Sequence, residues 1–352
     1  MKLVKHYKDM IDKELQKFLD WRLQRAAKVS PEAKEAIEHI KEFNLRGGKR
    51  IRPILVILGY RACGGKDDKA IMEAALAVEL MESYLLMHDD IIDQDELRRG
   101  YLTMHKVFEN KARRLYPASN SAHYGTCMAI LHGDIAAILA SEALVNSRFP
   151  PKRKLHALDM FNRVVVNTCF GQILDMHSEI EPLVREADVM KIHKLKTAIY
   201  TVDGPLAIGA LLAGASKKQL ASLSGYAIPL GIAFQVQDDI LGLFGSEKEI
   251  GKSVGNDIRE GKKTLLILKA LENASTQERA FLNRCLGKRD ISLADIEKVR
   301  DIVRRTGSLE YSLALVKDLT SKSVSALKSA PLDKNTICSL QELAVYVRDR
   351  KR

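Results

Sequence analysis

The chain has 352 residues and a net charge of +11, and 46% of its residues are hydrophobic and 29% charged. This balance is that of a globular protein, and it excludes a disordered or fibrous one. With only 21 glycines and 9 prolines, helices are favoured over strands and turns. We therefore expect one all-α domain over residues 1–352, although the length alone would allow two domains of ordinary size.

The N-terminal part of the chain is predicted to be helical. Amphipathic helix covers residues 2–43, with a break at Ser30 and Pro31, which suit the N-cap and first position of a second helix. A basic turn with two glycines follows over residues 44–53, and Pro53 is expected to open the next helix. Residues 69–93 are almost continuously apolar on a helical period, which indicates a buried central helix.

The rest of the chain is also predicted to be mainly helical. Proline, asparagine and serine cluster in residues 110–124, which therefore read as an exposed connection. Helical patterns return over residues 126–148, 153–179, 206–214 and 221–244, and from residue 264 onward. Between the last two, residues 245–261 read as a charged loop interrupted by glycines.

The first cluster that could carry chemistry is HDDIIDQDELRRG, residues 88–100. Asp89 and Asp93 are four residues apart, so on a helix their carboxylates share one face and repel each other. They also lie near the C-terminal end of the helix, where the macrodipole disfavours acids. A hard cation such as Mg²⁺ would compensate, because it binds carboxylate and phosphate oxygens. The alternative is an ordinary acidic helix end in water.

A second acidic cluster lies in FQVQDD, residues 234–239. Gln235, Asp238 and Asp239 share one stripe of a helix and follow an apolar run, which makes simple solvation less natural. Two carboxylate sites flanked by apolar helices predict facing helices that line one cavity.

Basic residues accompany both acidic clusters. Three cations follow Gly47 and Gly48 in GGKRIRP at a predicted helix start, which is a favourable place for an anion. Arg98 and Arg99 follow the first cluster, and arginine matches phosphate oxygens, although such a pair is often a surface ion pair. Each lysine taken alone is more often solvated. Together, the acidic and basic clusters favour a diphosphate substrate bound through Mg²⁺, with an apolar remainder.

Five motifs in this order resemble those of the trans-isoprenyl diphosphate synthases, or polyprenyl synthetases: GGKRIRP, DDIID with RRG, GQ at residues 171–172, KT at residues 196–197, and FQVQDD. The resemblance extends over residues 45–271 and is greatest to archaeal geranylgeranyl diphosphate synthases. It implies an antiparallel bundle of helices around a deep central cavity, in a homodimer. It also implies condensation of isopentenyl diphosphate with an allylic diphosphate by ionisation, condensation and elimination, with geranylgeranyl diphosphate as the expected product.

The resemblance also implies a role for individual residues. Isopentenyl diphosphate would be bound by Lys49, Arg52 and Arg99. About three Mg²⁺ ions would be bound by Asp89, Asp93 and Asp238. The allylic diphosphate would be bound by Arg98, Lys196, Lys252 and Lys262. Thr197 and Gln235 would lie beside the developing cation, with Gln172 and Asp175 supporting the site from behind.

Three positions bear on how this chain differs from the family pattern and on product length. Gly242 stands where many members carry a third aspartate of the second motif, and Glu82 stands where the family commonly has His or Gln against isopentenyl diphosphate. In the family, an aromatic residue five positions before the first motif closes the cavity, and that residue is Tyr84 here. Helical geometry alone places Leu85 nearer the aspartate face, and a core role for Tyr84 is the alternative.

Other functions share part of this pattern. Within the family, a farnesyl diphosphate synthase or a bifunctional farnesyl and geranylgeranyl synthase would use the same residues. A terpene cyclase would carry a different second motif, and a non-catalytic subunit of a heteromeric synthase would carry degraded aspartate motifs. The cations are dispersed and aromatic residues are only 6%, so no nucleic-acid partner is expected. Five scattered cysteines and no run of about 18 apolar residues predict a cytoplasmic protein without a transmembrane segment.

Overall fold

The computed structural model describes residues 2–245 and 255–350. The regular structure of the described residues is helical, apart from one two-stranded hairpin, β1 (Leu97–Arg98) and β2 (Tyr101–Leu102). The all-α prediction is therefore confirmed. The chain divides into two compact units, residues 1–158 with 208–214, and residues 159–207 with 215–352. Whether they behave as the single domain predicted from the sequence stays a prediction.

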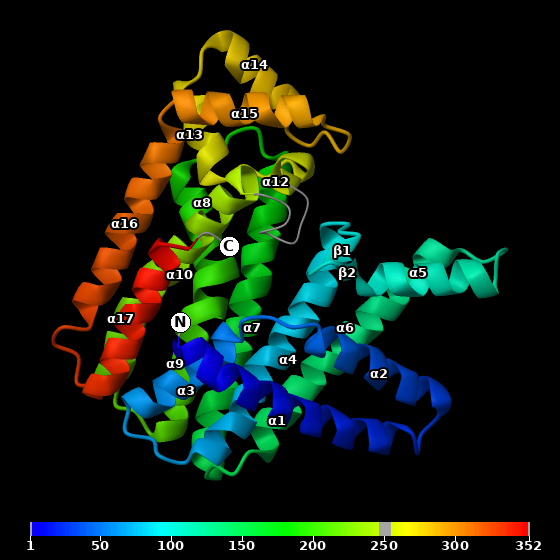
Figure 1. Ribbon diagram of the computed structural model, residues 1–352, viewed down its shortest axis with the longest axis vertical. Coiled ribbons are helices and arrows are strands. Elements are labelled where there is room, and N and C mark those ends of the chain that lie inside the picture. Colours follow the sequence, from blue (N-terminus) through cyan, green and yellow to red (C-terminus); the bar gives the residue numbers. More distant parts are fainter. Residues whose placement is uncertain (1, 246–254, 351–352) are drawn as a thin grey trace. The chain divides into compact units, whose positions relative to one another are not determined.

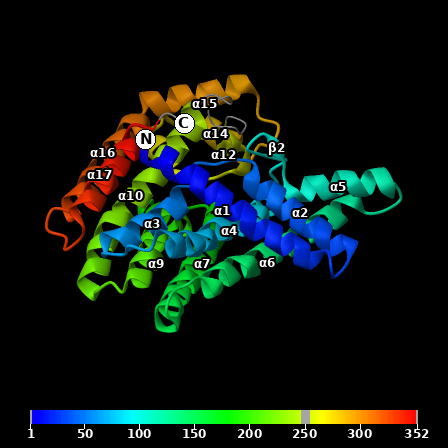
Figure 2. The ribbon, with the colours of Figure 1, turned by 60° about the horizontal axis from the view of Figure 1, so that its bottom comes forward.

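The first unit is built around a long apolar helix. Its helices are α1 (Lys2–Ala26), α2 (Pro31–Leu45), α3 (Ile51–Ala62), α4 (Asp68–Ile92), α5 (Met104–Leu115) and α6 (Ser121–Asn146). Helix α4 packs against α3 on one side and α6 on another, as Figures 1 and 2 both show. Leu80, Met81 and Met87 of α4 are fully buried. The predicted central helix is thus confirmed, to within one residue at each end.

The second unit is built around helix α10 (Lys217–Phe244), which packs against η1 (His193–Asp203), α16 (Ser308–Ala326) and α17 (Lys334–Arg348). Its other helices include α8 (Glu186–Ile192), α12 (Asn256–Glu260), α13 (Leu265–Asn273), α14 (Thr276–Cys285) and α15 (Leu293–Arg305). Helices α7 (Pro151–Ile180) and α9 (Gly204–Ala213) each contribute residues to both units.

Local sequence signals account for most helix boundaries. Ser30 is the N-cap of α2, where its hydroxyl accepts a hydrogen bond from the Ala33 amide and Pro31 is the first helical residue, as predicted. Helix α3 begins at Ile51, so Pro53 stands in its first turn rather than at its first position. Proline fits there because the amides of the first turn lack partners within the helix.

The prediction that residues 110–124 form an exposed connection is wrong for most of that segment. Helix α5 continues to Leu115 and α6 begins at Ser121. Phe108 and Ala112 of α5 are buried, so packing of its apolar face keeps the helix going until Tyr116, next to Pro117. The loop predicted over residues 245–261 contains the short helix α12, and residues 246–254 lie outside the described part.

In the described part of the chain, two helices, α6 and α10, have the length and apolar composition that a membrane span requires. Within these apolar windows, 44% of α6 and 56% of α10 is buried inside the structure. Core helices of globular proteins have the same properties, so the two helices are weak evidence for a membrane span.

Candidate active site

The first acidic cluster lies where the sequence predicted, at the C-terminal end of α4. Asp89 and Asp90 belong to its last turn, and Asp93 caps it. Carboxylate oxygens of Asp93 and Asp95 lie within 4.8 Å of each other. This all-oxygen set of donors is the kind that Mg²⁺ binds. Asp95 was not singled out from the sequence, although it is two residues from Asp93.

Arg98 compensates much of the negative charge at this helix end. Its Nε donates to Asp90 Oδ1 at 2.5 Å, and its Nη2 lies 3.4 Å from Asp89 Oδ2 and 3.3 Å from Asp95 Oδ2. Burial alone would lower the pKa of Arg98, but the Asp90 and Asp89 carboxylates raise the pKa well above its ordinary value. The residue expected to bind the allylic diphosphate is therefore engaged with the acidic motif in this structure.

Arg98 and Arg99 are presented by the hairpin β1–β2. Both central residues of its turn, Arg99 and Gly100, have positive φ angles of 55° and 80°, the backbone of a tight type I′ turn. Arg99 Nη1 donates to the Gly47 carbonyl at 2.9 Å. The hairpin thereby contacts the GGKRIRP segment, so two motifs distant in sequence meet within the first unit.

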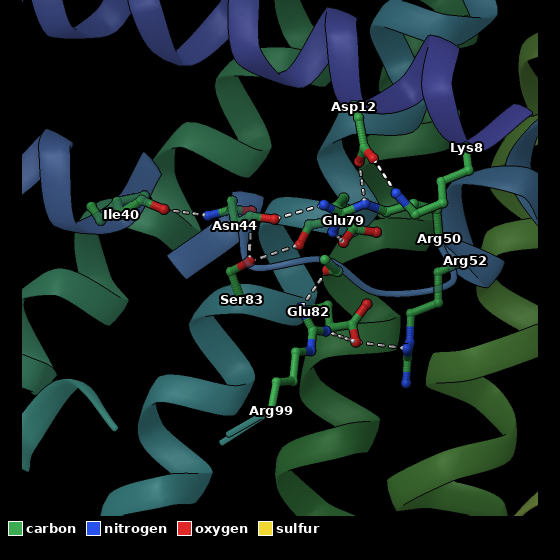
Figure 3. A network of polar contacts seen from close by, with 11 residues as sticks. Lys8, Asp12, Ile40, Asn44, Arg50, Arg52, Glu79, Glu82, Ser83 and Arg99 are labelled. Carbon is green, nitrogen blue, oxygen red and sulfur yellow. Dashed lines mark hydrogen bonds and ion pairs between the residues drawn. The ribbon is translucent and has the colours of Figure 1, made fainter. Parts of the chain in front are cut away.

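Glu82 lies between the two arginines expected to bind isopentenyl diphosphate. Its Oε1 is 3.0 Å from Arg52 Nη1 and 3.3 Å from Arg99 Nη2, and its side chain is only 14% exposed. Figure 3 shows both contacts. The sequence left the role of this carboxylate open. In the structure, the guanidinium groups of Arg52 and Arg99 balance its charge. Lys49, on the same segment as Arg52, is exposed.

The second acidic cluster, in the second unit, has its own set of partners. Asp238 Oδ1 lies 2.5 Å from Nη1 of Arg350, near the C-terminus. Asp239 is buried, accepts a hydrogen bond from Gln235 Nε2 at 2.7 Å and lies 3.3 Å from His193 Nε2. Both carboxylates face protein groups, but the Asp238 side chain is 39% exposed and that of Asp239 only 6%, so Asp238 is the more accessible to a cation.

Lys196 and Thr197 lie on η1, a π-helix that the sequence did not predict. Wide turns of this kind are often found at functional sites. Lys196 Nζ donates to Asp175 Oδ2 at 2.6 Å, and Thr197 Oγ1 donates to Gln235 Oε1 at 2.6 Å. Asp175 therefore supports Lys196 directly, and Gln172 lies half-buried one turn earlier on α7.

Close helix packing holds η1 against α10. A Cβ atom at Gly231 of α10 would lie 2.4 Å from the Ala198 Cα and 2.7 Å from its Cβ. Only glycine allows this approach, which brings Thr197 within hydrogen-bonding reach of Gln235. The short distance between the backbones of η1 and α10 thus positions Thr197 and Gln235 in the second unit.

A cleft of about 520 Å³, which includes some open solvent, collects these residues within the second unit. Its lining includes Asp175, Lys196, Thr197, Gln235, Asp239 and Lys262. Lys262 forms an ion pair with Glu260. Lys252, also expected to bind the allylic diphosphate, lies outside the described residues.

Asp257 also lines the cleft and stands beside Gly242. A Cβ atom at Gly242 would come 3.0 Å from Asp257 Oδ2. A carboxylate from another segment therefore occupies space next to the position where many family members have a third aspartate. Sequence reasoning missed Asp257, His193 and Arg350, because no local pattern marks them.

Tyr84 is buried on α4, with its ring 5.5 Å from the His88 ring in an edge-on arrangement. Leu85 beside it is half-buried. This placement is compatible with a residue that closes a cavity and with a residue that only fills the core.

Comparison with known proteins adds a family relationship to this geometry. The model of the polyprenyl synthetase family matches residues 33–303. The geranylgeranyl diphosphate synthase of Sulfolobus acidocaldarius is 34% identical, over 80% of this chain and 80% of that protein. The geranylfarnesyl diphosphate synthase of Aeropyrum pernix is 31% identical, over 86% and 91%.

Among solved structures, the chain is similar to a geranylgeranyl pyrophosphate synthase from Corynebacterium glutamicum, complexed with isoprenyl diphosphate and magnesium. The TM-score is 0.93 and the sequence identity 31%, and the match covers 98% of each chain.

Proposed function

The chain belongs to the polyprenyl synthetase family, and we propose on this basis that it makes geranylgeranyl diphosphate from isopentenyl diphosphate and an allylic diphosphate. It is a trans-prenyltransferase. The product is inferred from the names of the relatives. A geranylfarnesyl product is the alternative, because two relatives are named geranylfarnesyl diphosphate synthases.

One structural observation carries the proposal. Each unit carries an aspartate cluster on an apolar helix, at the C-terminal end of α4 and more than one turn before the end of α10. An arginine pairs with each cluster, Arg98 with the first and Arg350 with the second. The dipole of α4 disfavours the first cluster, and apolar surroundings disfavour uncompensated carboxylates in both. Their presence there is explained if the site binds a cation together with an anionic substrate.

We assign the two diphosphates to different sets of residues. The isopentenyl diphosphate is assigned to the exposed Lys49 and to Arg52 and Arg99, which already contact one carboxylate together. The allylic diphosphate is assigned to Arg98, Lys196, Lys252 and Lys262. About three Mg²⁺ ions are assigned to Asp89, Asp93 and Asp238. Bound Mg²⁺ would supply charge stabilisation for the departing diphosphate.

The proposed reaction proceeds in three steps. The allylic carbon–oxygen bond breaks, and the bond's electrons leave with the diphosphate, to which Lys196 and Arg98 donate hydrogen bonds. The double bond of isopentenyl diphosphate attacks the allylic cation and forms the new carbon–carbon bond. A proton then passes to the departed diphosphate. The oxygens of Thr197 and Gln235 stabilise the cation, and apolar residues of the helices exclude the water that would capture it.

The bundle around a deep central cavity, with both acidic motifs facing it, belongs to this proposal. The proposal also includes Tyr84 as the residue that closes this cavity and limits the product to twenty carbons. Tyr84 lies on α4, one to two turns before the first aspartate cluster, and its burial supports a position inside the bundle.

We also propose a homodimer in the cytoplasm. The exposed side of α6 carries a stripe of apolar side chains at intervals of seven residues, each at least 42% exposed: Tyr124, Leu131, Ile138 and Val145. A stripe with this spacing suits antiparallel packing against the same helix of a second copy. Light scattering of the Ile138→Glu variant should show monomers where the parent protein shows dimers.

One experiment tests the function. The protein is incubated with isotope-labelled isopentenyl diphosphate, Mg²⁺ and each short allylic primer in turn, and the products are separated by chain length. A twenty-carbon diphosphate is expected, and a fifteen- or twenty-five-carbon product would correct the length. If no primer gives a labelled product, the protein is instead a non-catalytic subunit of a heteromeric synthase.

A further inference from the structure

Arg50, at the start of α3, is a buried arginine with an unfavourable backbone. Its side chain is 1% exposed, and its φ angle is 54°. This left-handed region is disfavoured for residues other than glycine, asparagine and aspartate. Gly47 and Gly48, just before it, also have positive φ angles. An arginine gains nothing from this backbone, so its side-chain contacts must hold it there.

Three helices supply those contacts, as Figure 3 shows. Arg50 Nε donates to Asp12 Oδ1 of α1 at 2.6 Å, and Nη2 donates to the Asn44 carbonyl of α2 at 2.7 Å. Nη1 forms an ion pair with Glu79 of α4, whose side chain is 3% exposed. Each nitrogen of the guanidinium thus has its own acceptor, and a planar fork of this kind defines one orientation.

The acceptors are themselves held in place. Lys8 Nζ donates to the second oxygen of Asp12 at 2.5 Å, and Ser83 Oγ donates to Asn44 Oδ1 at 2.7 Å. Burial alone would raise the pKa of Asp12, but hydrogen bonds from Lys8 and Arg50 leave the pKa below its ordinary value. Asp12 therefore remains charged near neutral pH, whereas burial raises the pKa of Glu79 even though Arg50 faces it.

Arg50 itself is enclosed by protein, but its neighbours are the groups assigned to the substrate. Lys49 precedes it and is exposed, and Arg52 follows two residues later. Glu79, which anchors Arg50, is one turn of α4 before Glu82, which lies 3.0 Å from Arg52. On the other side of the turn, Arg99 is hydrogen-bonded to the Gly47 carbonyl. The GGKRIRP segment is thus held by Glu82 of α4 on one side and by Arg99 of the hairpin on the other.

We propose that Arg50 is a positioning residue for isopentenyl diphosphate, and that it acts through the backbone of residues 48–52 to hold Lys49 and Arg52 where they bind that substrate. This inference rests on the proposed function. Arg50 touches no substrate. The three contacts of its guanidinium compensate for the unfavourable left-handed backbone at the start of α3. Loss of these contacts lets Lys49 and Arg52 shift together.

The test compares Arg50→Lys with a matched control on the same helix, Arg61→Lys. Lysine keeps the charge beside Glu79 but cannot make three bonds in one plane. Arg61 pairs with Asp68 at the surface, where its side chain is 39% exposed. Steady-state kinetics measure KM for each substrate and kcat, and calorimetry measures isopentenyl diphosphate binding without a primer.

For Arg50→Lys, KM and the dissociation constant for isopentenyl diphosphate should rise about tenfold, in the range expected for slightly misplaced binding groups. KM for the allylic primer and kcat should stay within about twofold of the parent values, as should all constants of the control. A general loss of structure would instead change both substrates alike. A folded Arg50→Lys protein with unchanged affinity for isopentenyl diphosphate overturns the proposal.

Asp12→Ala keeps the proposal testable if Arg50→Lys does not fold. Alanine is a good helix former within α1, and Arg50 keeps its Glu79 partner. KM for isopentenyl diphosphate should rise about threefold, again without a change for the primer. Equal values in the parent protein and Asp12→Ala would then overturn the proposal. Turnover by the parent protein tests the proposed function separately, because the positioning role is measured only as a ratio between variants.

Discussion

Glu82 gives the sharpest prediction for the chain as a whole, because it departs from the family pattern and contacts two arginines assigned to a substrate. We expect Glu82→Gln to bind isopentenyl diphosphate more tightly. The substitution keeps the size of the side chain and its ability to accept hydrogen bonds, and it removes one negative charge 3.0 Å from Arg52 and 3.3 Å from Arg99.

The size of the effect follows from the distances. A phosphate oxygen that shares these two guanidinium groups would come roughly 5 Å from the Glu82 oxygen. At that distance one pair of unit charges repels by ~1 kcal/mol in a water-like dielectric and ~3 kcal/mol at an effective dielectric of about 20. Part of this gain is lost because Gln holds the arginines less firmly. A net change of ~1.4 kcal/mol corresponds to a KM about tenfold lower.

The assay varies labelled isopentenyl diphosphate at saturating primer and then reverses the roles of the two substrates. KM should fall for isopentenyl diphosphate alone. Glu73→Gln is the matched control, since Glu73 lies on the same helix and pairs with Arg148 away from the site, and its constants should not change. An unchanged or raised KM for isopentenyl diphosphate in Glu82→Gln would refute the reasoning, and a raised value would mean that the carboxylate orders the arginines instead.

Four further outcomes are expected. Asp89→Ala should abolish turnover while circular dichroism shows an intact fold, and substantial remaining turnover would contradict its role. Tyr84→Ala should lengthen the product in chromatography, whereas an unchanged distribution would leave Tyr84 as core only. Gly231→Ala should lower the free energy of unfolding by ~1–3 kcal/mol, because its methyl group would lie 2.4 Å from the Ala198 Cα, and an equal melting temperature would rule out this close packing. Arg350→Gln should lower the Mg²⁺ concentration for half-saturation in calorimetry, because Arg350 competes with a cation for the second acidic motif, and equal Mg²⁺ affinity would exclude that competition.

The sequence alone determined the fold class, many helix boundaries and the identity of both acidic clusters. The signals for these are local. Apolar residues on a helical period mark α4, Ser30 and Pro31 mark the start of α2, and aspartates four residues apart share a helix face wherever the helix packs. Where local signals misled, as in residues 110–124, burial of one helix face outweighed residues that favour turns.

Only the tertiary structure decided which charges are paired. Arg50 meets Asp12 across 38 residues. Asp238 of α10 meets Arg350, which lies two residues after the end of α17 and belongs to no motif. Likewise, Gly231 lets α10 approach η1, the π-helix that carries Lys196 and Thr197. Such pairings are set by how helices pack, and the sequence separation of two residues places almost no restriction on that packing.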